Sequence, residues 1–269
     1  MATDAFLSAA LDTARAAAAA ASRVAMQHFR RLDRVETKAD GSPVTVADRE
    51  AEAAMRAVIV RAFPDHAVLG EESGLDARGG GGGGGGPSGD RVRWILDPID
   101  GTRGFSRGGA HWGPLVACEV GDGIVAAAME LPVLGRTYAA AKGRGCHRDG
   151  VRCRIGDRTD WSEATISVGE LTRLLKSPRA AAWTELMASA ACVRSYGDLA
   201  GCAMVLDGVA DLWIEGGVSI WDVAAPRLLI EEAGGVFTDF AGVATHASGE
   251  ALAGGAALRA FVAARLRAE

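Results

Sequence analysis

The sequence lacks several features that mark common functional classes. It has no sustained run of lysine or arginine, and its 29 basic residues are outnumbered by 34 acidic ones, which gives a formal net charge of -5. This balance excludes the electrostatic footprint of a non-specific nucleic-acid binder or of a protein that binds anionic membranes. No apolar run approaches the roughly 20 residues needed to cross a bilayer. We therefore expect no nucleic-acid or membrane partner, and a small molecule as ligand.

Cysteine is scarce as well, and its spacing excludes two further classes. The five cysteines are odd in number and include no Cys-x-x-Cys pair, so neither a disulfide framework nor a zinc cluster is indicated. We expect small buried side chains in a protein of the reducing cytoplasm. A dinucleotide site is excluded because no G-x-G-x-x-G segment stands between an expected strand and an expected helix.

What the sequence does contain is enough apolar material for a large core. Of its 269 residues, 49% are hydrophobic, and strong helix formers predict helices over about 4–31 and from Thr45 to the break at Pro64. The alternation of elements that follows predicts an α/β fold with helices layered on sheets. The expected strands are 67–69, 92–96, 115–120, 124–131, 136–141, 164–168, 192–195, 210–214 and 236–238, and the later helices are 178–190, 198–207, 221–233 and 256–266.

Eight consecutive glycines at 79–86, followed by Pro87-Ser88-Gly89, form the only low-complexity segment. Such a run holds no fixed conformation by itself, so we predict a flexible surface loop over 79–89. Since the entropy of closing a loop grows only with the logarithm of its length, the loop does not have to divide a domain. Two roles stay open for it, an active-site lid and an inert insertion.

The strongest chemical signal is the segment WILDPIDGT at 94–102. An apolar strand runs into Asp97 and Asp100 where Pro98 and Gly101 turn the chain sharply, so both carboxylates are expected at one strand end. An ordinary turn would explain these residues equally well.

Two other acidic positions favour a functional site over an ordinary turn. Glu71 follows a second short apolar run, and Asp222 opens a helix directly after Gly216-Gly217. Taken singly, Glu71 is typical of a solvated surface and Asp222 of a helix N-terminus. Together with Asp97 and Asp100, however, they make four acidic sites at sharp element boundaries, which those ordinary roles do not explain.

Carboxylates that meet in one place repel one another unless a cation compensates their charge. Oxygen ligands without histidine favour Mg²⁺, with Mn²⁺ as a substitute, and these metals most often serve phosphate chemistry. The turn at 100–102 adds exposed N–H groups, which attract a phosphate. The residues therefore predict a metal-dependent phosphoryl site.

Four segments in this order carry a family resemblance, namely GEES at 70–73, DPIDGT at 97–102, WDVAA at 221–225 and EEAGG at 231–235. The chain resembles the inositol monophosphatase family of Mg²⁺-dependent, lithium-sensitive phosphatases from about Lys38 to Asp239. The resemblance implies an αβαβα sandwich, commonly a homodimer. It also implies one phosphatase unit over 1–269, with an N-terminal half of about 1–160 and a C-terminal half of about 161–269.

Within that family the chain is most similar to the bacterial histidinol-phosphate phosphatases. The similarity lies in the segments SPVT at 42–45 leading to Asp48, GTR at 101–103 with Phe105, HWG at 111–113 and YGD at 196–198. Arg103 and Gly104 depart from the family pattern beside the phosphate segment, where an Asn commonly precedes Phe105. The departure affects the expected substrate choice and leaves the metal ligands in place.

The resemblance also implies a role for each site residue. The first metal ion would be held by Glu71, Asp97 and the backbone carbonyl of Ile99, and the second by Asp97, Asp100 and Asp222. A third ion would lie near Glu71 through water. The catalytic set that orients and deprotonates a metal-bound water would be Asp48 and Thr102, assisted by Glu71. The substrate would be bound by Gly101, Thr102, Asp198, Glu215 and Asp222, with Asp198 and Glu215 on the side of the leaving group.

This assignment predicts in-line attack of water on phosphorus without a phosphoenzyme. We expect a phosphomonoesterase that prefers L-histidinol phosphate. The near alternative is the same chemistry on myo-inositol 1-phosphate or on a sugar or nucleotide phosphate such as 3′-phosphoadenosine 5′-phosphate. A remote alternative is a binding protein that keeps the fold without the activity.

Overall fold

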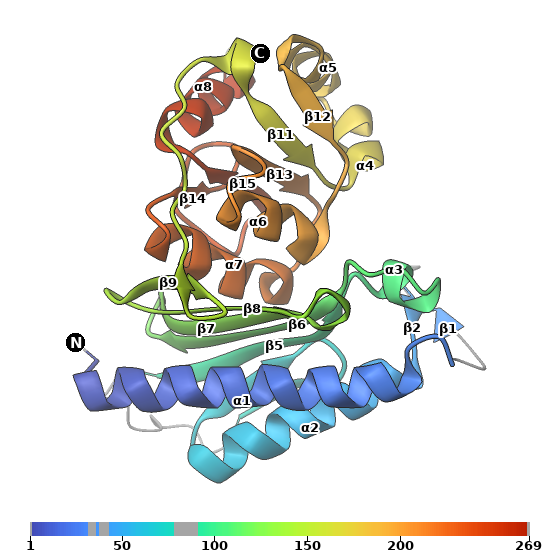
Figure 1. Ribbon diagram of the computed structural model, residues 1–269, viewed down its shortest axis with the longest axis vertical. Helices are drawn as coiled ribbons and strands as arrows, with labels where there is room; N and C mark the ends of the chain where they lie inside the picture. Colours follow the sequence, from blue (N-terminus) through green and yellow to red (C-terminus); the bar gives the residue numbers. More distant parts are fainter. Residues whose placement is uncertain (1, 32–35, 38–42, 78–90, 268–269) are drawn as a thin grey trace.

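The computed structural model describes residues 2–31, 36–37, 43–77 and 91–267. The expected glycine-rich loop at 79–89 lies outside these residues, so both of its possible roles stay open. Figure 1 shows the described part as a stack of layers, with the first two helices below and the C-terminal half above. Among the described residues, every helix is either too short or too polar to cross a bilayer.

Two N-terminal helices form the first layer. α1 (Asp4–His28) packs along α2 (Val46–Ala62) mainly through alanine side chains that are fully buried, so the two helices approach each other closely. α1 ends three residues before the predicted end at Arg31, because the backbone leaves the helical conformation at Phe29, where ψ is 124°, and Arg30 then adopts a left-handed conformation with a φ of 62°. A small two-stranded sheet of β1 (Glu36–Thr37) and β2 (Pro43–Val44) follows.

The second layer is an eight-stranded sheet in the order β10-β9-β8-β7-β6-β5-β3-β4. Its neighbouring strands are antiparallel except for β3 and β5, which run parallel. The strands are β3 (Ala67–Gly70), β4 (Gly74–Asp76), β5 (Val92–Asp100), β6 (Gly113–Val120), β7 (Gly123–Leu131), β8 (Arg136–Ala141), β9 (Gly145–Arg148) and β10 (Val151–Arg152). α1 and α2 cover one face of this sheet (Figure 1).

A middle layer of helices covers the opposite face. α6 (Asp198–Leu206) and α7 (Ile220–Glu232) share one hydrophobic core with residues of both sheets, such as Met129 from β7 and Trp213 from the second sheet. The two halves of the chain are therefore joined by continuous apolar packing.

The second sheet has five strands in the order β12-β11-β13-β15-β14. The strands are β11 (Thr165–Val168), β12 (Cys192–Arg194), β13 (Leu212–Gly216), β14 (Val236–Thr238) and β15 (Glu250–Gly254). Its outer face packs against α4 (Leu171–Lys176), α5 (Ala180–Ser189) and α8 (Ala256–Arg267), as seen at the top of Figure 1. The layers alternate as αβαβα, which confirms the predicted fold class.

The structure contains elements that the sequence patterns did not indicate. β15 has the sequence EALAG, which includes no β-branched residue, so its intrinsic strand signal is weak. It is a strand because it pairs with both β13 and β14. β4, β9, β10, α4 and the single-turn α3 (Thr102–Ser106) were also missed, since each has only two to six residues.

All five cysteines are free, and four of them are buried. These four lie among apolar core residues, as expected, whereas Cys192 in β12 is only partly buried.

Candidate active site

The parallel pair of strands brings two of the predicted acids together. Gly70 of β3 lies opposite Leu96 of β5, so Glu71 and Asp97 follow neighbouring strands at the same edge of the sheet. The backbone N–H of Glu71 donates a hydrogen bond to the carbonyl of Leu96 at 3.2 Å, which fixes this arrangement. Since parallel strands end on one side of a sheet, the two carboxylates approach each other.

The end of β5 is irregular where its two acids lie. The pairing with β6 shifts register between Asp97 and Asp100, and an Asp97 carboxylate oxygen accepts a hydrogen bond from the N–H of Ile99 at 2.9 Å. Bulges of this kind redirect side chains at the end of a strand. Asp97 and Asp100 are both buried, so their carboxylates face the interior.

A fourth acid, Asp222, comes from the start of α7. Ser219 and Asp222 form a reciprocal capping box, in which Asp222 Oδ2 accepts a hydrogen bond from the N–H of Ser219 at 2.6 Å. Asp222 therefore both caps α7 and contributes a carboxylate to the site. One carboxylate oxygen from each of Asp97, Asp100 and Asp222 lies within 4.8 Å of the others, and we refer to these three residues as the acidic cluster.

Electrostatics makes the acidic cluster unfavourable without a cation. Burial raises the pKa of Asp97 well above its ordinary value, and the charges of Glu71, Asp100 and Asp222 raise it further. Burial and the neighbouring carboxylates also raise the pKa of Asp100. A donor set made only of oxygens in so negative an environment fits a hard divalent cation such as Mg²⁺.

The carboxylate of Asp48 and the hydroxyl of Thr102 lie beside the acidic cluster. Asp48 is fully buried in the first turn of α2, where its Oδ2 accepts hydrogen bonds from the N–H and the hydroxyl of Thr45, each at 2.7 Å. The Thr102 hydroxyl lies 3.3 Å from the other oxygen of Asp48 and 2.9 Å from the carbonyl oxygen of Ile99. The predicted pair of Asp48 and Thr102 is thus in contact, and Thr45 orients the carboxylate.

Gly101 provides the turn between β5 and α3. Its φ is 82°, a conformation that glycine adopts without strain, and a Cβ there would lie only 2.9 Å from the carbonyl oxygen of His111. The chain can therefore turn sharply directly after Asp100, at the end of β5.

The C-terminal half contributes three further carboxylates near the acidic cluster, from Glu170, Asp198 and Glu215. Asp198 and Glu170 have positive φ angles of 55° and 43°, which are strained for residues other than glycine and often mark functional positions. Burial, with the charges of Asp222 and Glu170, raises the pKa of Asp198 to about 6, and nearby Arg103 opposes this shift. We call Glu170, Asp198 and Glu215 the acidic rim.

Glu215 is more deeply buried than the sequence indicated. Only 1% of it is exposed, and its Oε2 accepts hydrogen bonds from the indole of Trp213 and the N–H of Asp198, both at 2.8 Å. Burial and the charge of Asp198 raise its pKa to about 8. Its other oxygen packs so closely against Gly169 and Gly197 that a Cβ on either glycine would lie within 2.5 Å of it. Glu215 therefore anchors the start of α6 as well as facing the site.

α6 is also tied directly to the acidic cluster. The N–H of Leu199, in its first turn, donates a hydrogen bond to Asp100 Oδ2 at 2.5 Å. The amino end of a helix favours a negative charge, so Asp100 links the two halves of the chain at the site.

Sequence reasoning missed Glu52, a buried carboxylate behind the predicted ligand Glu71. Its oxygens accept hydrogen bonds from the N–H groups of Glu72 at 2.7 Å and Ser73 at 3.1 Å, and it pairs with Arg56 at 2.8 Å. Glu52 thus holds the turn that presents Glu71. Its position one helical turn after Asp48, on the buried face of α2, is the sequence signal that could have revealed it.

Two aromatic side chains border the site at its surface. The rings of His111 and Tyr196 lie 5.0 Å apart, and they come from opposite halves of the chain. His111 is therefore close to the region for which the sequence singled it out, and it contacts a residue of the YGD segment.

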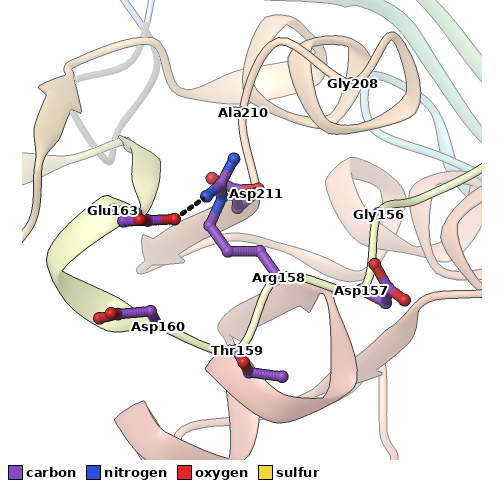
Figure 2. A pocket seen from close by; sticks show the side chains of 9 residues that line it. All are labelled: Gly156, Asp157, Arg158, Thr159, Asp160, Glu163, Gly208, Ala210 and Asp211. Atoms are coloured by element: carbon purple, nitrogen blue, oxygen red, sulfur yellow. Dashed lines mark hydrogen bonds and ion pairs between the residues drawn. The ribbon is translucent and has the colours of Figure 1, made fainter.

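A hollow of about 470 Å³ lies elsewhere and includes none of the acids above; it is lined by residues 156–160, Glu163, Gly208, Ala210 and Asp211. Figure 2 shows Arg158 extending through it toward Glu163 and Asp211. Arg158 pairs with these carboxylates at 2.6 and 3.2 Å. The side chain of Arg158 therefore fills part of the hollow, where its two ion pairs hold the segment that connects the two sheets.

Comparison with known proteins places this geometry in a family. The family model described as "Inositol monophosphatase family" matches residues 7–268. The chain belongs to the inositol monophosphatase family, and it is a phosphomonoesterase. The family resemblance in the sequence is thereby confirmed.

Curated relatives carry more than one name. The chain is 35% identical over 233 residues to "Histidinol-phosphatase" of Chlorobaculum parvum, covering 86% of each chain, and 34% identical to the protein of that name from Streptomyces coelicolor, covering 90% and 91%. It is 33% identical to "Nus factor SuhB" of Pseudomonas aeruginosa, covering 86% of each.

Solved structures share the fold along nearly the whole chain. The extragenic suppressor protein suhB of Bartonella henselae has a TM-score of 0.83 and 27% identity, covering 96% of this chain and 98% of its own. The inositol monophosphatase of Anabaena has a TM-score of 0.80 and 26% identity, covering 96% and 95%.

Proposed function

We propose that the chain is a Mg²⁺-dependent phosphatase that hydrolyses L-histidinol phosphate to L-histidinol and inorganic phosphate. The observation that carries the metal dependence is the acidic cluster, where oxygens of three carboxylates lie within 4.8 Å of one another. Two to three ions would be held by Glu71, Asp97, Asp100, Asp222 and the carbonyl of Ile99, with Mn²⁺ as a substitute. When bound, Mg²⁺ supplies the positive charge that the phosphate oxygens require and promotes the ionisation of water.

The chain's own residues would perform the remaining tasks. The N–H groups of Gly101 and Thr102 would bind phosphate oxygens. Asp48 would accept the proton of the attacking water on the oxygen that faces Thr102, because its other oxygen is engaged by Thr45. Glu71 would help to orient that water.

The acidic rim supports a cationic leaving group. Glu170, Asp198 and Glu215 are additional to the acids of the cluster. Two cations act on them, because Arg173 pairs with Glu170 at 3.2 Å and the charge of Arg103 acts on Asp198. An ammonium group beside such carboxylates is stabilised, whereas a neutral polyol gains only hydrogen bonds. Histidinol carries an ammonium group and inositol does not. The names of the relatives from C. parvum and S. coelicolor support the same substrate.

A substrate panel tests this proposal. Phosphate release from L-histidinol phosphate, myo-inositol 1-phosphate and 3′-phosphoadenosine 5′-phosphate is compared at equal enzyme and Mg²⁺ concentrations. We expect the highest kcat/KM for L-histidinol phosphate and no release after EDTA treatment. A lack of preference for histidinol phosphate contradicts the substrate assignment, and release that persists in EDTA contradicts the metal dependence.

A matched pair of variants tests the reason for the preference. Asp198→Asn keeps a residue that tolerates positive φ but removes the charge. Because a hydrogen bond to a charged group is worth about 1.5–3 kcal/mol, kcat/KM for histidinol phosphate should fall about 10- to 100-fold while the inositol 1-phosphate value changes less. Asp122→Asn, in the exposed turn after β6, is the control. An equal loss on both substrates refutes the charge argument.

The nearest alternative is hydrolysis of myo-inositol 1-phosphate, supported by the name of the similar Anabaena protein. The substrate panel separates the two. A binding protein without activity is the remote alternative, and it requires the absence of turnover on the whole panel with metal bound. A homodimer, a cytoplasmic location and the division into halves near residue 160 remain predictions.

A further inference from the structure

A second cavity, of about 670 Å³, lies on the outer face of the second sheet. Trp213 donates a hydrogen bond to Glu215, and Glu215 accepts another from the N–H of Asp198 in α6, so both residues point to the side of α6. Gly216 points to the other side, where an added Cβ would meet Leu174 at 3.2 Å and Phe240 at 3.5 Å. These two residues line the cavity, so it lies across the sheet from Glu215, and at its edge Arg173 pairs with Glu170 of the acidic rim at 3.2 Å. Its volume is in the range of small-molecule sites.

Charges of both signs line the cavity. Arg173 and Arg179 contribute two guanidinium groups, and 62% and 38% of their side chains are exposed. Glu250 contributes one carboxylate, whose Oε2 accepts a hydrogen bond from the N–H of Phe240 at 3.0 Å. Arg179 lies 3.8 Å from Glu250 Oε1, too far for a direct hydrogen bond. Arg173 donates a hydrogen bond from Nε to Glu170 Oε2 at 3.2 Å, and its two NH₂ groups are not part of that bond. The cationic and anionic groups are thus held near each other, and Arg179, Glu250 and the NH₂ groups of Arg173 keep capacity for a ligand.

The floor of the cavity is apolar and firmly packed. Leu174, Trp183 and Phe240 line it and are at most 4% exposed. The rings of Trp183 and Phe240 form an edge-to-face pair with centroids 4.8 Å apart. A ligand with a flat apolar part would contact this floor while its polar groups face the charges.

We propose that this cavity binds a free α-amino acid with an aromatic side chain. The carboxylate would pair with the guanidinium groups of Arg179 and Arg173, which bind carboxylates in a planar, two-pronged geometry. The ammonium group would pair with Glu250, and the ring would lie against the floor. A molecule that has a carboxylate but no ammonium group would leave Glu250 without a cationic partner. An amine without a carboxylate would leave the two arginines without an anionic partner.

The cavity wall leads directly to the acidic cluster. Gly217 lies against Arg173, and the N–H groups of Gly217 and Val218 donate to the carbonyl of Gly249 at 2.7 and 3.2 Å. The next residue, Ser219, caps α7 through Asp222. A ligand that binds the arginines can therefore shift residues 217–219, which position Asp222. We expect such a ligand to change the rate of hydrolysis. That effect, unlike the binding, rests on the proposed function.

Calorimetric titration of the metal-free chain tests the binding. The probe is L-phenylalanine, with 2-phenylethylamine and 3-phenylpropanoate as analogues that lack the carboxylate and the ammonium group. We expect saturable binding of L-phenylalanine and at least about tenfold weaker binding of either analogue. No binding of L-phenylalanine, or equal binding of an analogue, overturns the proposal.

Variants locate the site. Arg179→Gln, Arg173→Gln and Glu250→Gln should each weaken binding about tenfold or more, and Arg265→Gln, which removes a surface ion pair with Glu185 on α5, should leave it unchanged. Arg179→Gln is the principal test because Arg179 lies on the surface and touches none of the rim acids. Unchanged binding in that variant overturns the site. Phosphate release measured with and without L-phenylalanine then separates the two proposals, since an inactive chain that still binds L-phenylalanine contradicts only the proposed function.

Discussion

Replacing Glu52 with glutamine should weaken metal binding without touching a metal ligand or the substrate. Glu52 is fully buried and accepts two backbone hydrogen bonds from the turn that carries Glu71, in addition to its pair with Arg56. In Glu52→Gln one oxygen becomes an NH₂ group, so at least one N–H donor faces another donor. The turn then loses its fixed geometry.

The magnitude follows from what is broken. Disrupting a buried charged pair costs about 3–5 kcal/mol, a large part of the about 5–15 kcal/mol that stabilises a typical domain. Changes to groups that orient metal ligands typically cost about 10- to 100-fold in affinity. We therefore expect the Mg²⁺ concentration for half-maximal activity to rise about 10- to 100-fold, while kcat at saturating Mg²⁺ stays within a few-fold.

The assay is phosphate release as a function of Mg²⁺ concentration, with urea denaturation of the metal-free protein in parallel. Glu50→Gln is the matched control, because Glu50 lies on the same helix with 54% of its side chain exposed and, within the described part of the chain, hydrogen-bonds to His28 at its surface. A loss of stability in Glu52→Gln with an unchanged Mg²⁺ requirement would refute the reasoning and leave Glu52 a purely structural residue.

Three further predictions concern the acids and their glycine neighbours. Asp97→Asn should lower hydrolysis by about 10³-fold or more, about 4 kcal/mol of transition-state stabilisation, yet raise the thermal midpoint of the metal-free protein at pH 8, because one repelling charge is removed. Calorimetry of the variant checks the second part, and a lowered midpoint would contradict it. The metal-free protein should lose stability as the pH rises. Folding raises the pKa of Asp97, Asp100 and Glu215, so the folded state binds more protons; for Glu215 the loss spans pH 4.5 to about 8. Urea denaturation across this window measures it, and a rise in stability there would disprove the assignment. Gly197→Ala should cost about 1–3 kcal/mol by overpacking against Glu215, whereas Gly156→Ala, with open space around it, should cost little; equal denaturant midpoints would contradict this.

The sequence predicted the helices and the acidic positions well where local chemistry decides them. Thr45 with Asp48 and Ser219 with Asp222 are capping pairs readable from a spacing of three residues, and both helices begin there. The turn around Pro98 likewise predicts that Asp97 and Asp100 lie at a strand end. These features depend on residues close together in the chain.

Features that depend on distant contacts were not predictable in this way. β15 is a strand because two other strands bond to it, and Glu52 orients a turn twenty residues further along the chain. The positive φ angles of Glu170 and Asp198 have no local signal either, since neither residue is a glycine. Each is held by packing that the linear pattern does not contain.

By itself the sequence determined which residues carry negative charge, where the chain turns and which surfaces are apolar, because these properties belong to the residues and their near neighbours. Only the tertiary structure decided that oxygens of three carboxylates meet within 4.8 Å, that Glu215 is buried between two glycines, and that a mixed-charge cavity lies behind the same sheet. The physical reason is that burial and charge interactions depend on distances through space, and those arise from the parallel register of β3 with β5 and the packing of α6 and α7 between the two sheets.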